Sequence, residues 1–113
     1  MTQPATKVVI VTEEVILKGI IKIIEEIGVR GYTVLSARGK GSHNVRSGGQ
    51  PSVTAAFTNV KIEAIVSDRA RAEKIADAIA AKYFDNFAGI AYLSQIEVLR
   101  GEKFKPGSSG GGA

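Results

Sequence analysis

The first third of the chain carries two apolar patterns in succession. Residues 7–11 form a short, nearly all-apolar run rich in Val and Ile, which is typical of a central strand buried in a sheet. A stripe of isoleucines with the spacing of an amphipathic helix follows: Ile16, Ile20, Ile23, Ile24 and Ile27. We expect Thr12 to cap this helix and Gly28 to end it. Glu13 and Glu14 are expected in its first turn, where they complement the helix dipole.

The remaining elements follow in a similar order. Residues 32–37 and 59–67 are predicted to be strands, and Asp68 to cap a second helix that runs to about Phe84. Residues 91–99 are predicted to be a fourth strand. Apolar and polar residues alternate in the third strand, which indicates a sheet with two different faces: Val60, Ile62, Ala64 and Val66 against Lys61 and Glu63. The second helix has a narrow face of small and aliphatic residues: Ala72, Ile75, Ala76 and Ile79.

This order of elements, β-α-β, a long loop and again β-α-β, predicts a fold class. It matches the α+β ferredoxin-like plan (βαββαβ), with a four-stranded antiparallel sheet. Right-handed crossovers place both helices on one face of that sheet. The other face, expected to carry Leu93, Ile65 or their neighbours, is left uncovered. We therefore expect it to bury itself against partner subunits in a cyclic homo-oligomer.

Composition narrows the possible chemistry. The 113 residues, 44% of them hydrophobic, suit one globular domain, which we assign to residues 1–104 with a flexible Gly/Ser-rich tail at 105–113. Cysteine is absent and His43 is the only histidine, which excludes disulfides, thiol catalysis and ordinary Cys/His zinc sites. The aliphatic runs are too short to span a bilayer, so we expect a cytoplasmic protein.

Positive charge is concentrated in one segment. The net charge is +4, but no acidic residue lies between Glu26 and Glu63. That interval contains five cations: Arg30, Arg38, Lys40, Arg46 and Lys61. A local cationic field of this size suits an anionic small ligand or an anionic partner better than it suits nucleic acid, whose binding domains usually spread more Lys and Arg over a face.

The same interval contains a long loop, residues 38–57. Loops above about 15 residues inside compact domains are uncommon and are usually functional or disordered. Its first half, residues 38–46, mixes glycines with side chains that bind phosphate, which favours an anion cradle. It is not a P-loop, which would need Gly at Val34 and Ser or Thr at Gly41, and a dinucleotide fingerprint would need Gly at Asn44. For residues 47–56, which carry no charge, the alternative that the glycines only keep a surface loop mobile stays open.

Several short motifs occur together in this chain. They are VVIVTE at residues 8–13, IIEE at 23–26, GYTV at 31–34, GKGS at 39–42, NVRS at 44–47, EKIAD at 73–77 and AGI at 88–90. In this combination the chain resembles, over residues 5–104, the PII-like SbtB family of regulators of cyanobacterial bicarbonate transport. The resemblance thus covers the whole predicted domain.

The resemblance implies a homotrimer that binds cyclic AMP, AMP, ADP and ATP in clefts between subunits, with no tightly bound cofactor and no metal. Residues 38–57 correspond to the T-loop of PII proteins, and residues 85–90 lie in the B-loop. The implied nucleotide contacts are Lys40, Gly41, Ser42, His43, Asn44, Arg46, Gly89 and Ile90. The distal T-loop is expected to dock on a partner through residues that include Ser47, Val53 and Phe57. The resemblance names that partner as the bicarbonate transporter SbtA, so the protein would be peripheral at the inner membrane when bound to the transporter, and would not bind lipid directly.

Two features depart from the family pattern. His43 stands where Arg is usual, and a Cys-containing C-terminal motif is replaced by residues 105–113. The second departure argues against ATP or ADP hydrolysis, so we expect a signalling protein and not an enzyme.

Two other function classes are weaker. RNA binding by an RRM-like sheet would need aromatic residues on the central strands, yet residues 7–11 and 59–63 contain none. A nucleotide-hydrolysing domain would need a catalytic base or nucleophile, and His43 has no acidic residue within fifteen positions to orient it.

Overall fold

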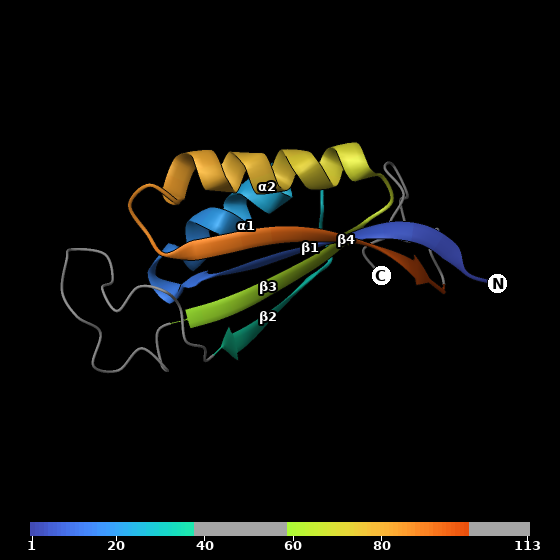
Figure 1. Cartoon of the computed structure of the whole chain (residues 1–113), viewed down its shortest axis with the longest axis horizontal. Helices are drawn as coiled ribbons and strands as arrows, with labels where there is room; N and C mark the ends of the chain where they lie inside the picture. The colour runs from blue at the N-terminus through green and yellow to red at the C-terminus, as the bar shows by residue number, and fades with distance from the viewer. Residues whose placement is uncertain (38–58, 100–113) are drawn as a thin grey trace.

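Two helices cover one face of a four-stranded antiparallel sheet in the computed structural model, which describes residues 1–37 and 59–99 (Figure 1). The elements in chain order are β1 (Gln3–Glu13), the 3₁₀ turn η1 (Glu14–Ile16), α1 (Leu17–Glu26), β2 (Tyr32–Ala37), β3 (Asn59–Val66), α2 (Arg69–Tyr83) and β4 (Gly89–Val98). The strand order is β2-β3-β1-β4, and each neighbouring pair is antiparallel. The predicted ferredoxin-like α+β fold is therefore confirmed. Among the described helices, none is long and apolar enough to cross a membrane.

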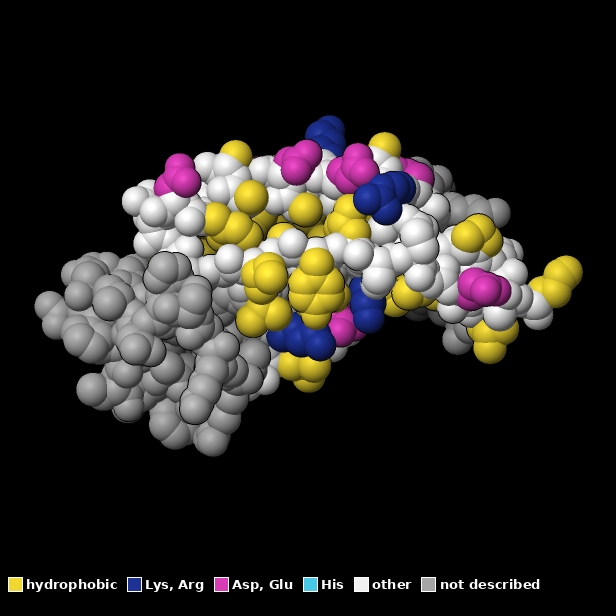
Figure 2. Space-filling view, viewed as in Figure 1, with side chains coloured by type: hydrophobic (Ala, Val, Ile, Leu, Met, Phe, Trp, Pro, Cys, Tyr) yellow, Lys and Arg dark blue, Asp and Glu magenta, His cyan; other side chains and the backbone are white. Residues whose placement is uncertain are grey.

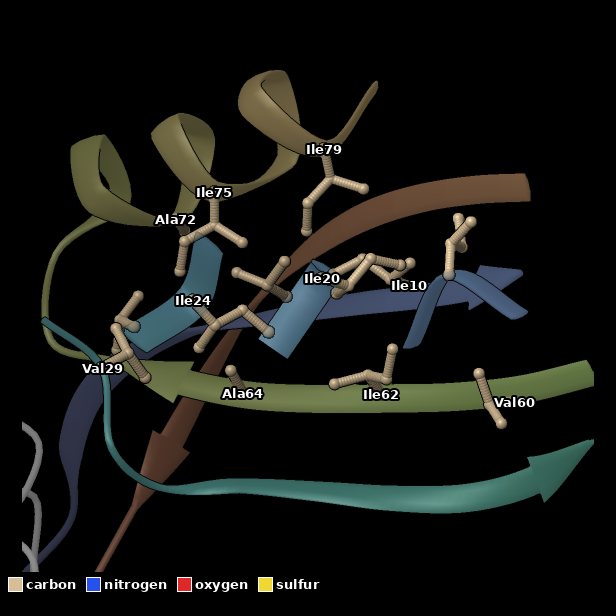
Figure 3. Close-up of a cluster of buried hydrophobic side chains, with 13 residues drawn as sticks. Ile10, Ile20, Ile24, Val29, Val60, Ile62, Ala64, Ala72, Ile75 and Ile79 are labelled. Carbon is tan, nitrogen blue, oxygen red and sulfur yellow. The ribbon is translucent and has the colours of Figure 1, made fainter. Parts of the chain in front are cut away.

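The core lies between the helices and the sheet (Figure 3). Residues paired across antiparallel strands share a face, and the register pairs Val8 with Ala64 and Ile10 with Ile62. Ile20 and Ile24 of α1 and Ile75 and Ile79 of α2 pack onto this face, and all four are fully buried. The predicted alternation in β3 is confirmed, since Val60, Ile62, Ala64 and Val66 are all buried. Full burial of each Val or Ile side chain contributes roughly 1.5 to 3 kcal/mol to stability.

The start of α1 differs from the prediction. Strand β1 continues through Thr12 and Glu13, η1 follows, and neither η1 nor α1 has a side-chain cap at its N-terminus. The hydroxyl of Thr12 instead donates to the backbone carbonyl of Ala88, 2.6 Å away. Thr12 is thus a strand residue and not an N-cap, because its hydroxyl is hydrogen-bonded to the backbone of another segment. The predicted first-turn position is correct for Glu14 only, and that turn is 3₁₀.

The other predicted helix ends are confirmed. Gly28 follows the last turn of α1 with a φ of 100°, a left-handed conformation that favours glycine. The amides of Gly28 and Val29 donate to the carbonyls of Glu25 and Ile24, which is the Schellman pattern of a helix C-terminus. At the start of α2, the carboxylate of Asp68 accepts from the Arg71 amide at 2.7 Å.

The opposite side of the sheet, which we call the open face, faces away from both helices (Figure 1). Its residues, read from the strand register, are Thr33 and Leu35 of β2, Lys61, Glu63 and Ile65 of β3, Lys7, Val9 and Val11 of β1, and Ile90, Tyr92 and Ser94 of β4. Ile65 lies there as expected, whereas Leu93 does not. Leu93 pairs with Val8 and packs against the core. Successive side chains of a strand point to opposite faces, and Leu93 points to the face that the helices cover. Its neighbour Tyr92 occupies the open face instead.

Candidate functional site

Both described parts of the candidate nucleotide site meet at one end of the sheet. Ala37 and Asn59, which flank the long loop, pair with each other, and Asn59 also pairs with Glu13 at the end of β1. Gly89 pairs with Thr12, the residue before Glu13. Neighbouring strands lie about 4.8 Å apart. The two ends of the loop and the start of β4 therefore lie at the same end of the sheet. This is consistent with a nucleotide site to which both segments contribute.

Of the predicted nucleotide contacts, the structure describes Gly89 and Ile90. They are the first two residues of β4 and both are exposed, Ile90 by 58%. The other predicted contacts and the predicted partner-docking residues lie outside the described residues: Lys40, Gly41, Ser42, His43, Asn44, Arg46, Ser47, Val53 and Phe57. For these the assignment stays a prediction.

Gly89 is required to be small for a reason that the sequence does not reveal. A Cβ at this position would lie 2.4 Å from Cε1 of Phe84, and two further ring atoms of Phe84 would lie within 2.9 Å. Real Cβ contacts of that length do not occur, so any side chain would push the ring aside. An aromatic ring of the same chain thus makes a close approach to this glycine. This neither excludes nor requires a ligand at the exposed backbone.

The short segment between α2 and β4 is held by the end of that helix and by β1. The amides of Asn86 and Phe87 donate to the carbonyl of Tyr83 at 3.0 and 2.9 Å, which continues the last helical turn. The rings of Tyr83 and Phe87 meet edge to face with their centroids 6.1 Å apart. At the far end, the amide of Ala88 donates to Oε2 of Glu13 at 2.7 Å. With the Thr12 bond, both polar backbone groups of Ala88 are fixed.

Thr12 and Glu13 are the residues at this site that the sequence interpretation did not recognise. The sequence pattern predicts a helix start for both, whereas the structure places them at the end of β1, each only 3% exposed. A useful signal is present in the sequence: two polar residues directly continue a nearly all-apolar run. Buried polar side chains need partners, so residues in such a place are expected to bond to another segment.

The described residues do not offer the features of two other kinds of site. Among them, no group of three or more His, Cys, Asp or Glu side chains could hold a metal ion. The central strands of the described sheet are β1 and β3, as predicted, and their open-face residues are Lys7, Val9, Val11, Lys61, Glu63 and Ile65. None of these is aromatic, so the central stacking platform of an RRM is absent from this part of the chain.

Comparison with known proteins gives a consistent result. The family model for nitrogen regulatory protein P-II matches residues 5–103. A protein from Thermus thermophilus described as PII-like signalling protein TTHA0516 is 35% identical, with a TM-score of 0.73 over 91% of this chain and 97% of that one.

Structures of CPII from Thiomonas intermedia K12, a nitrogen regulatory PII-like protein, share the fold. One, bound to ADP, AMP and acetate, is 23% identical with a TM-score of 0.75 over 93% of this chain and 98% of that one. Another, bound to ADP, AMP and bicarbonate, is 24% identical with a TM-score of 0.75 over 93% and 97%.

Proposed function

The chain belongs to the nitrogen regulatory protein P-II family and is a PII-like signalling protein, and from this premise we propose that it senses adenine nucleotides and controls a membrane transporter. The observation that carries the proposal is the family match over residues 5–103. The adenine nucleotides ADP and AMP are bound by CPII, which has the same fold. The resemblance to the SbtB family adds cyclic AMP and ATP as candidate ligands.

The proposed nucleotide site combines the long loop with the start of β4. Arg46 is the strongest candidate for holding a phosphate, because a guanidinium can donate two parallel hydrogen bonds to it. Lys40, Gly41, Ser42, His43 and Asn44 complete the loop side, and Gly89 and Ile90 supply the other side. The sheet register supports this arrangement, since Ala37, Asn59 and Gly89 lie at the same end of the sheet.

We propose a homotrimer whose subunits associate through the open face, with the nucleotide sites between them. Large hydrophobic side chains are exposed there, namely Leu35 by 51%, Tyr92 by 44% and Ile90 by 58%. Figure 2 shows hydrophobic side chains gathered along the sheet beside Lys and Arg side chains, with an acidic side chain among them, while most of the acidic side chains in this view lie along the helix side above. Light scattering should give about three times the 11.9 kDa of one chain. A mass of one chain would contradict the trimer and the sites between subunits.

The proposed partner is the bicarbonate transporter SbtA, reached from the cytoplasm by protein contact and not by lipid. Ser47, Val53 and Phe57 lie in a neutral part of the loop suited to a partner's cleft, next to the proposed phosphate-binding part. Nucleotide binding would select the loop conformation that docks or the one that does not. We propose signalling through this loop and no catalytic role.

Calorimetry with ADP, AMP, ATP and cyclic AMP tests nucleotide sensing. Arg46→Ala should weaken binding by about 1.5 to 3 kcal/mol, the range for a hydrogen bond to a charged group. Arg30→Ala is the matched control, because it removes a cation of the same interval outside the proposed site. Equal losses in both variants would indicate a general charge effect, and no binding of any of the four nucleotides by the wild type would overturn the proposal.

Transporter control is tested by pull-down of purified SbtA with no nucleotide and with each nucleotide in turn. Linkage is reciprocal, so a nucleotide that strengthens docking must bind more tightly when the transporter is present. Docking that is indifferent to every nucleotide, or that persists after deletion of residues 47–56, would contradict this part of the proposal.

A further inference from the structure

Ala88, the residue before β4, is held from two sides by neighbouring residues of β1. Its carbonyl oxygen accepts from Oγ1 of Thr12 at 2.6 Å, and its amide donates to Oε2 of Glu13 at 2.7 Å. Both distances are those of strong hydrogen bonds, and the second is charge-assisted. We call Thr12 and Glu13 the Ala88 clamp.

The clamp lies at the base of the exposed backbone that follows. Gly89 pairs with Thr12 and Ile90 pairs with Val11, so the first two residues of β4 are in register with the strand that holds Ala88. Ala88 itself is exposed, and Gly89 has no side chain of its own to hold it in place. A loss of either clamp bond would free the backbone just before Gly89. The two side chains that hold Ala88, the residue just before Gly89, are themselves buried.

We propose that Thr12 and Glu13 are positioning residues for nucleotide binding, which preset the backbone of residues 88–90 before the ligand arrives. This inference rests on the proposed function, in which Gly89 and Ile90 contact the nucleotide. Neither clamp side chain need touch the ligand. A backbone that is already fixed costs less conformational entropy on binding, so the clamp should raise affinity.

Glu13 makes the inference sharply testable, because an opposite role is chemically reasonable. A carboxylate that occupies a backbone N–H close to an anion site could stand where a phosphate would bind, and its removal would then strengthen binding. If Glu13 instead positions the backbone, removal of its carboxylate should weaken nucleotide binding. The two roles also differ for Glu13→Gln, whose amide oxygen can still accept from the Ala88 amide although the charge is gone.

The experiment is calorimetric titration of the full-length protein with ADP. Thr12→Val, which keeps the shape and removes the hydroxyl, and Glu13→Ala should each raise the Kd by about tenfold, the scale of one lost hydrogen bond. Thr12→Ser and Glu13→Gln should keep the Kd within about threefold of the wild type, because each retains its bond.

Thr6→Val is the matched control. Thr6 is another buried threonine of β1, 2% exposed, and its hydroxyl donates across to Oε1 of Gln95 at 3.2 Å, far from Ala88 along the strand. We expect its loss to lower the thermal midpoint without changing the ADP Kd. Hydrogen exchange of the amides of residues 88–90 should accelerate in Thr12→Val and stay unchanged in Thr6→Val, which separates local positioning from general stability.

The possible failures are distinguishable. Binding of ADP by the wild type with an unchanged Kd in both Thr12→Val and Glu13→Ala would overturn the clamp alone. Tighter binding in both Glu13 variants would overturn it in favour of a carboxylate that competes with phosphate. Absence of ADP binding by the wild type would overturn the proposed function and this inference together. If Glu13→Ala does not fold, the Thr12→Val and Thr12→Ser pair decides the question.

Discussion

The two faces of the sheet are built from the same strands and yet differ in what covers them. On the helix side Val8, Ile10 and Ile62 are completely buried within one subunit. On the open face Leu35 and Tyr92 remain 51% and 44% exposed, and a Lys61–Glu63 ion pair at 3.4 Å lies among the apolar residues. The first face is complete in a single chain, whereas the second has an apolar surface over which neither described helix lies.

This difference between the two faces indicates which contributions to the stability of the protein should depend on protein concentration. Interactions on the covered face form whenever the chain folds, so their contribution is the same at every protein concentration. In the proposed homotrimer the open face is buried by other copies of the chain, so the contribution of that burial should follow mass action. Val9 lies between the two cases, because it points to the open side but is already buried between its cross-strand neighbours Glu63 and Tyr92.

The largest effect is expected for a cavity on the covered face. Ile10→Ala should lower the free energy of unfolding by about 2 to 5 kcal/mol, because the fully buried site cannot collapse around the missing atoms. Urea unfolding at two protein concentrations measures it. The loss should be the same at both, and a loss that varies with concentration would break the proposed contrast between the faces.

A smaller loss is expected where the covered face meets the start of β4. Gly89→Ala should lower the free energy of unfolding by about 1 to 3 kcal/mol, because the new Cβ displaces the Phe84 ring. The matched control is Gly31→Ala, since a Cβ at Gly31 would meet nothing within 4 Å. Urea unfolding should show the control within about 0.5 kcal/mol of the wild type. Equal losses would mean that glycine flexibility, and not the ring, determines the effect.

On the open face, Leu35→Ala should change the free energy of unfolding by less than about 0.5 kcal/mol at concentrations where the subunits are apart, because the side chain is already half exposed. At higher concentrations, where copies associate, the loss should grow. Unfolding followed over a dilution series, with light scattering in parallel, measures both. A loss that is large in the dissociated subunit would show that Leu35 has an intramolecular role.

The smallest effect is expected for the ionisation of Tyr32, in the edge strand β2. Partial desolvation and then the carboxylate of Glu25 raise the pKa of Tyr32 above its ordinary 10.0, and the phenol donates to Oε2 of Glu25 at 3.4 Å. The neutral phenol is thus favoured on folding. This contribution is present below the unfolded pKa and is lost as pH rises through the raised value. Ultraviolet titration should show that Tyr32 ionises above its ordinary pKa, and Glu25→Gln should lower the pKa of Tyr32.

Much of the fold could be predicted from local signals. Strand β2 has the predicted bounds, and Asp68 and Gly28 have the predicted roles, because an N-cap and a left-handed glycine depend on only a few neighbouring residues. Strand β1 is longer than predicted, since it includes polar residues such as Gln3 and Thr6. Pairing of β1 with β3 on one side and β4 on the other provides hydrogen-bond partners for its backbone groups. Such pairing between distant segments cannot be predicted from a local sequence pattern.

The candidate site was less predictable for the same reason. Gly89 and Ile90 were reached through the family resemblance and not through a local pattern, and the structure places both at the exposed start of β4. The reason for the glycine is Phe84, and the supports of Ala88 come from Thr12 and Glu13, far away in sequence. These contacts join residues that are distant in sequence, so they form only in the complete fold and no local sequence pattern predicts them.

The central position of β1 also has a consequence for the order of folding. This strand pairs with β4 from Gln3 opposite Val98 to Thr12 opposite Gly89, so its partner on that side is synthesised after every other strand that the structure describes. Contacts between such distant segments require a large loss of chain entropy before they become favourable, and folds rich in them form slowly. Until β4 arrives, the nascent chain therefore has an unpaired edge along β1, most of whose residues are buried in the complete fold, and we expect chaperones to bind it at this stage.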